Sequence, residues 1–234
     1  MLHDLLKHQS LSKISGRFAR YIGKKYNNKI TVGEYIVERF IDKKINVGFS
    51  YKQNNYTHFF QIANKYPNFD IVFNSHEPST GYCALSYAKH TNNLGLILST
   101  STYGFTNICK ALNDAQNNNI PLLLMSFYDQ ESESKLTKSM RPERKYFKEY
   151  HTANTADKLP ELLEYSMMIA EIYKKGSVHL NICNSILKRP VYLDEIVVDE
   201  KIIPDKKDLN LLQFYEKSYE QIEQKELEEK KLFT

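Results

Sequence analysis

The stretch SHEPSTGYCALSYAK, residues 75–89, places His76 and Glu77 directly after the apolar run DIVFNS and at the start of a predicted helix. A carboxylate in the first turn of a helix complements the helix dipole, an effect worth about 0.3–1 kcal/mol. A carboxyl at this position can also hydrogen-bond a ligand over the helix start, where shielding from water suits it to proton transfer. Glu77 is therefore either a structural helix-start residue or the residue on which ligand chemistry depends.

Other chemistries find little support in the sequence. The serine- and threonine-rich run at residues 99–102 lacks the Gly-x-Ser-x-Gly elbow of a hydrolase, and no G-x-G-x-x-G or P-loop spacing is present for nucleotide phosphates. The net charge of +4 is too mild for a nucleic-acid-binding surface. The three cysteines lack metal-ligand spacing, and no apolar run approaches the roughly 20 residues of a membrane span. We therefore expect a cytoplasmic protein that binds neither nucleic acid nor membranes.

Short apolar runs alternate with helical patterns along the middle of the chain. Thr31 and Glu34 have the spacing of a capping box at the start of a predicted helix, TVGEYIVERFIDKK. The elements that follow are predicted, in order, as the strand 47–51, the helix YTHFFQIANKY, the strand DIVFNS, the helix with Glu77, the strand LGLILST, the helix GFTNICKALNDAQNN, the strand IPLLLMSFY, the strand EYHTAN, the helix LPELLEYSMMIAEIYKK and the strand VHLNIC. This alternation predicts a three-layer α/β/α fold with a central, mostly parallel sheet of about six strands. Ligands of such sheets bind at the carboxyl ends of the strands.

The pattern divides the chain into three parts. We expect a basic helical extension in residues 1–29, the α/β domain in residues 30–187, and a linker with a charged helix in residues 188–234. The C-terminal helix has only a thin apolar seam, so it either packs lightly on the domain or binds a partner.

Three motifs resemble the thiamine-diphosphate-dependent enzyme family, of the acetolactate synthase and pyruvate or sulfopyruvate decarboxylase type. The stretch HEPSTGYCALSYAK is similar to the His-Glu helix of the N-terminal pyrimidine-binding domain in that family. The stretch LGLILSTSTYGFTN resembles the following strand and turn, which commonly read T-S-G-P-G-x-T-N, and ALNDAQNNNIPLLLMS resembles the next helix and strand. The resemblance covers residues 30–187 and concerns the pyrimidine-binding domain alone.

The resemblance implies roles for particular residues. In that family the glutamate at the position of Glu77 hydrogen-bonds the aminopyrimidine ring of thiamine diphosphate and so promotes formation of the reactive ylid. Glu77 is accordingly the expected catalytic residue. The cofactor is expected to lie against the matching positions His76, Thr102, Tyr103, Gly104, Asn107 and Gln53. No residue of this chain is expected to bind a metal, because in the family a second domain holds the diphosphate through Mg²⁺.

The chain departs from the family pattern at the loops that meet the cofactor. None of its eight glycines belongs to the Gly-Asp-Gly signature of the diphosphate-binding domain. The glycine-rich loop after the first strand is replaced by SYKQNN, and Thr102 and Tyr103 replace part of Gly-Pro-Gly, which removes room for a ligand near the backbone. We therefore expect thiamine diphosphate binding to be weak or lost, with Mg²⁺ bound only together with a partner chain.

Three functions remain open from the sequence. The first is a stand-alone homologue of the pyrimidine-binding domain, a truncated pseudoenzyme that acts by binding or by self-association as a homodimer. The second is one subunit of a split thiamine-diphosphate-dependent 2-oxoacid decarboxylase or acetolactate-synthase-like enzyme, a lyase or transferase completed by a separate diphosphate-binding chain. The third is a structural or interaction protein. The loop departures favour the first function over the second.

Overall fold

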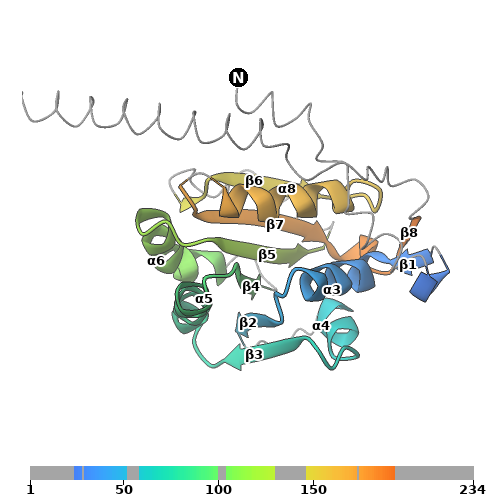
Figure 1. Ribbon diagram of the computed structural model, residues 1–234, viewed down its shortest axis with the longest axis horizontal. Coiled ribbons are helices and arrows are strands. Elements are labelled where there is room, and N and C mark those ends of the chain that lie inside the picture. Colours follow the sequence, from blue (N-terminus) through green and yellow to red (C-terminus); the bar gives the residue numbers. More distant parts are fainter. Residues whose placement is uncertain are drawn as a thin grey trace, which may run out of the picture. The chain divides into compact units, whose positions relative to one another are not determined.

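Six parallel strands form the central sheet of the protein. The computed structural model describes residues 24–27, 29–51, 58–99, 104–129, 146–172 and 174–192, and Figure 1 shows how their helices and strands are arranged. In sheet order the strands are β3 (Asp70–Asn74), β2 (Val47–Tyr51), β4 (Gly95–Ser99), β5 (Leu122–Tyr128), β7 (Ser177–Cys183) and β6 (Glu149–Ala153). Every neighbouring pair in this sheet is parallel. The predicted sheet is therefore confirmed.

Helices cover both faces of the sheet. They are α3 (Val32–Asp42), α4 (His58–Ala63), α5 (Glu77–Thr91), α6 (Gly104–Asn117) and α8 (Leu159–Glu171). Side chains of α3, α4 and α8 share one buried cluster with Leu123, Met125 and Phe127 of β5, whereas those of α5 and α6 share a second with Leu122 and Leu124. Because successive side chains of a strand point to opposite faces, β5 separates the two clusters, and the predicted three-layer α/β/α fold is confirmed.

The capping box predicted at the start of α3 is present. The backbone N–H of Glu34 donates to Thr31 Oγ1 at 3.4 Å, and the backbone N–H of Thr31 donates to Glu34 Oε2 at 3.0 Å. Both donors would otherwise lack a partner within the helix, so the pair defines where α3 begins.

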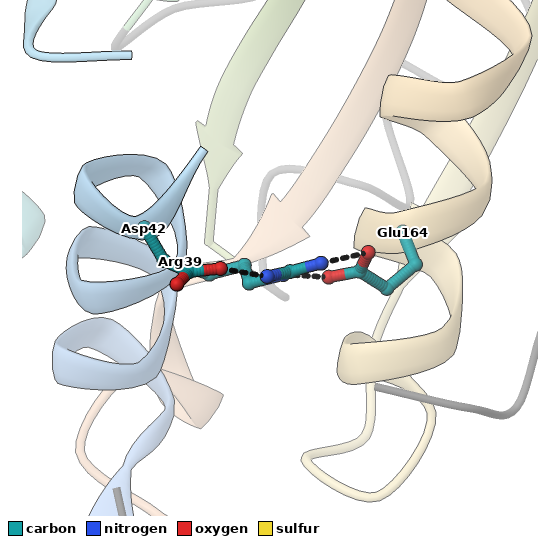
Figure 2. Close-up of polar contacts among 3 residues, drawn as sticks. All are labelled: Arg39, Asp42 and Glu164. Carbon is teal, nitrogen blue, oxygen red and sulfur yellow. Dashed lines mark hydrogen bonds and ion pairs between the residues drawn. The ribbon is translucent and has the colours of Figure 1, made fainter. Parts of the chain in front are cut away.

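A buried ion pair joins α3 to α8 (Figure 2). Arg39, only 4% exposed, donates from Nη2 to Glu164 Oε2 at 2.7 Å, and its Nε donates to the other oxygen of the same carboxylate. Asp42, one turn further along α3, accepts from Nη1. Burial by itself lowers the pKa of Arg39, but the hydrogen bonds and charge of Glu164 outweigh it and the pKa is raised. This two-pronged contact fixes the spacing of the two helices.

A second, two-stranded sheet joins the two ends of the domain. β1 (Lys29–Thr31) pairs antiparallel with β8 (Pro190–Tyr192). Nearby, the backbone N–H of Val32 donates to the carbonyl of Arg189 at 2.9 Å, and that of Gly33 to the carbonyl of Leu187 at 3.0 Å. The sequence pattern did not predict this pairing, which attaches residues beyond the expected boundary at 187 to the start of α3.

The two expected terminal helices fall largely outside the described residues. Residues 24–26 are helical, while the rest of the expected N-terminal helix and the whole of the charged C-terminal segment after residue 192 are not described. Within the described ranges, no helix has the length and apolar character needed to cross a membrane.

Candidate functional site

Glu77 is the first residue of α5 and follows the end of β3 by three positions. His76 is the N-cap residue, with an extended backbone (φ −136°, ψ 127°) and no capping hydrogen bond from its side chain. Pro78 lies in the first turn of the helix, where the backbone N–H that proline lacks would have had no helical partner. This short connection presents Glu77 at the carboxyl edge of the sheet, where ligands of open parallel sheets bind.

Asn107 contacts Glu77 at this edge. Asn107 lies in the first turn of α6, and its side-chain Nδ2 donates a hydrogen bond to Glu77 Oε2. The Glu77 side chain is half-buried and that of Asn107 is exposed. Residues that are far apart in the sequence thus meet where the two helices begin.

Close packing of α5 on α6 positions the two helix starts. A Cβ atom on Gly81 would lie 2.7 Å from Ala111 Cβ and 2.9 Å from Ile108 Cγ2, so the absence of a side chain permits this approach. On the same stretch of α5, Tyr82 Oη donates to Asp114 Oδ2 of α6 at 2.7 Å. The helices therefore stay in contact from their starts to Tyr82 of α5 and Asp114 of α6, and the hydrogen bond between Asn107 and Glu77 is one end of this interface.

Part of the predicted site lies in the described residues. The positions at the two helix starts are His76, Glu77, Gly104 and Asn107. The remaining predicted positions, Gln53, Thr102 and Tyr103, fall outside the described residues. The catalytic role of Glu77 and the cofactor contacts of the other residues stay predictions.

A buried polar cluster that the sequence pattern did not single out lies on the face of the sheet that α5 and α6 cover. Ser126 Oγ of β5 lies 2.7 Å from both His179 Nε2 and Asn181 Oδ1 of β7. Asn181 Nδ2 donates to Tyr150 Oη of β6 at 3.3 Å. The strand register pairs Ser126 with Asn181 and Leu124 with His179, which puts these side chains on one face. The signal available in the sequence was the polar residue at every second position of β7, namely Ser177, His179 and Asn181.

His179 in this cluster is a neutral donor. Burial lowers its pKa to about 3, and the nearby charge of His151 acts in the same direction. Asn181 Oδ1 can only accept, so the Ser126 hydroxyl donates to it and accepts from the Nε2–H of His179. A serine nucleophile requires an imidazole nitrogen that takes its proton. The cluster is therefore structural and is not the active site of a hydrolase.

The helix starts carry polar groups that suit the edge of a heterocyclic ring. A carboxyl and an amide side by side offer both acceptor and donor groups to the edge of a planar ring. The described part of the chain contains no group of three or more His, Cys, Asp or Glu side chains that could hold a metal.

The fold and the position of Glu77 define an α/β domain of the kind that binds a ligand at the carboxyl edge of a parallel sheet. Residues 30–155 match the family described as thiamine pyrophosphate enzyme, N-terminal TPP binding domain. The chain belongs to this family, and the resemblance inferred from its motifs is confirmed.

Two known proteins illustrate the relationship. The mitochondrial acetolactate synthase of Schizosaccharomyces pombe (strain 972 / ATCC 24843) is 27% identical over 96 residues, which cover 41% of this chain and 14% of that protein. The solved thiamine diphosphate-dependent 4-hydroxybenzoylformate decarboxylase of Rhodococcus jostii RHA1 shares the fold with a TM-score of 0.61 and 18% identity, over 68% of this chain and 31% of that one. This chain thus spans less than a third of the length of either protein.

Proposed function

We propose that this chain provides the pyrimidine-binding half of a thiamine diphosphate site and is catalytically incomplete by itself. The observation that carries the proposal is the position of Glu77, at the start of α5 and in contact with Asn107. Membership of the family supports the assignment, as does the similarity of residues 76–89 to its His-Glu helix.

In the proposed site, Glu77 hydrogen-bonds a ring nitrogen of the aminopyrimidine. The cofactor, when bound, supplies the ylid chemistry of decarboxylation and carboligation. The contribution of this chain is to orient the ring and to hold or release a proton at a carboxyl oxygen of Glu77.

The other half of the site has no candidate among these 234 residues. Gly-Asp-Gly is absent from the sequence, and the diphosphate with its metal supplies most of the binding free energy of such a cofactor. With the ring alone, we expect a dissociation constant of about 1 mM or weaker, equivalent to about 4 kcal/mol. Mg²⁺ and tighter binding would require a diphosphate-binding domain in addition to these residues.

An NMR titration of the isotope-labelled chain with thiamine diphosphate tests the ring site. At about 10 mM cofactor, roughly ten times the expected dissociation constant, we expect shifts confined to the first turns of α5 and α6. The variant Glu77→Gln, which is nearly isosteric, should keep the fold and lose most of this response. A titration that leaves both helix starts unchanged contradicts the proposal and favours a structural or interaction protein.

A split 2-oxoacid decarboxylase or acetolactate-synthase-like enzyme is the second candidate, favoured by the retained carboxyl of Glu77. Exchange of the thiazolium proton of the cofactor separates the two candidates. The isolated chain should show no exchange above background. If a separate chain with a Gly-Asp-Gly domain produces an exchange rate that Glu77→Gln abolishes, the split enzyme replaces the stand-alone homologue.

We further propose that the chain is cytoplasmic and self-associates as a homodimer. The support for self-association is that the surface by which a pyrimidine-binding domain meets other domains is expected to be apolar, and apolar surfaces favour association.

A further inference from the structure

The hydrogen bond between Asn107 and Glu77 links two helices at the positions where each begins. An amide N–H donates and cannot accept, so the Glu77 oxygen that it meets is held as an acceptor. The amide carries no net charge, so it fixes the direction of the carboxyl without bringing in the long-range field of a lysine or arginine.

The packing of α5 on α6 brings Asn107 and Glu77 together. Because Gly81 has no side chain, α6 approaches α5 closely at this position. Further along the same interface, Tyr82 donates a hydrogen bond to Asp114. The backbone positions of both helix starts are therefore set by packing, and one short amide is long enough to reach the carboxyl.

We infer that Asn107 is a positioning residue for Glu77. The inference rests on the proposed function only for the catalytic role of Glu77. Asn107 holds the carboxyl at the carboxyl edge of the sheet through a contact within the chain, so the ring would meet a side chain that the protein itself orients. This preorganisation reduces the side-chain ordering that binding would otherwise require.

The reactivity of the Glu77 carboxyl in the full, cofactor-free chain tests this inference. The chain is labelled with a water-soluble carbodiimide and glycine ethyl ester, and the rate of modification at Glu77 is followed by peptide mass spectrometry. Asn107→Ala should raise that rate about threefold to tenfold, because the hydrogen bond from the amide no longer protects the carboxyl. The exposed carboxyl of Glu161 on α8 serves as an internal reference whose rate should not change.

Three further variants separate positioning from general stability. Asn107→Gln keeps the donor on a longer arm and should restore much of the protection. Asn117→Ala, at the exposed far end of α6, is the matched control and should leave the Glu77 rate unchanged. Gly81→Ala forces the helices apart and should raise the Glu77 rate with Asn107 intact.

The outcomes are independent of cofactor binding. If Asn107→Ala leaves the Glu77 rate at the wild-type value, or raises it no more than it raises the rate at Glu161, the inference is wrong. A selective rise at Glu77 with an unchanged melting temperature supports it. A failed thiamine diphosphate titration together with this selective rise leaves Asn107 as the residue that orients Glu77 and removes only the proposed ligand.

Discussion

His179 should make the stability of this protein fall steeply in mild acid. The side chain is buried in β7, where Ser126 and the rings of Phe147 and Tyr150 surround it, and burial lowers its pKa to about 3. In the unfolded chain an imidazole titrates near its ordinary value of about 6.5. Between these two pKa values the unfolded chain binds a proton at His179 and the native chain does not, so protonation stabilises the unfolded state.

The size and sign of the effect follow from that difference. Above about pH 6.5 the imidazole is neutral in both states and its full contribution to stability is present. Each pH unit below that value costs about 1.4 kcal/mol, and the loss levels off near pH 3 after a total of about 5 kcal/mol. That total is comparable to the whole stability of many domains.

Urea unfolding of the wild type and of His179→Gln, at several values between about pH 4 and about pH 8, isolates this contribution. The glutamine variant loses the ring contacts, which lowers its stability by an amount independent of pH, and its stability should decline less steeply in acid. His90→Gln on the exposed end of α5 is the matched control and should follow the wild type. Parallel curves for the wild type and His179→Gln would refute the reasoning. If the variant does not fold, the imidazole proton shifts of wild-type His179 should remain at their neutral values down to about pH 4.

Three other predictions concern packing and assembly. Glu164→Gln removes one of the two carboxylates that contact the buried guanidinium of Arg39 and leaves Asp42, so it should cost about 1.5–3 kcal/mol by urea unfolding. Replacing both Arg39 and Glu164 by methionine should cost less, because no buried charge then remains. Gly95→Ala should lower the stability by about 1–3 kcal/mol, because its Cβ would lie 2.6 Å from the backbone carbonyl oxygen of Ala84. Gly33→Ala should cost less, because the obstructing atom there is the flexible end of the Ile62 side chain. Equal costs at the two glycines would contradict this account. Light scattering at tens of micromolar should detect a dimer, and a monomer alone at that concentration, typical of weak interfaces, would count against self-association.

The sequence by itself determined the elements whose signal is local. The capping box of Thr31 and Glu34 predicted the start of α3, because both partners lie within one helical turn. The alternation of apolar strands with helices predicted a parallel sheet covered on both faces, because a crossover helix is the usual way to return to a parallel strand. Glu77 was predicted at a helix start because the apolar run before it and the helical pattern after it are both local in the sequence.

The tertiary structure decided the contacts between residues that are distant in the chain. β1 and β8 are three residues each, too short for a periodic pattern, and only their mutual pairing makes them strands. Asn107 contacts Glu77 because Gly81 lets α6 approach α5, and no pattern within either helix encodes that distance. The same holds for Arg39 and Glu164, since the attraction between a buried charge and its partner depends on which side chains the fold places within a few ångströms.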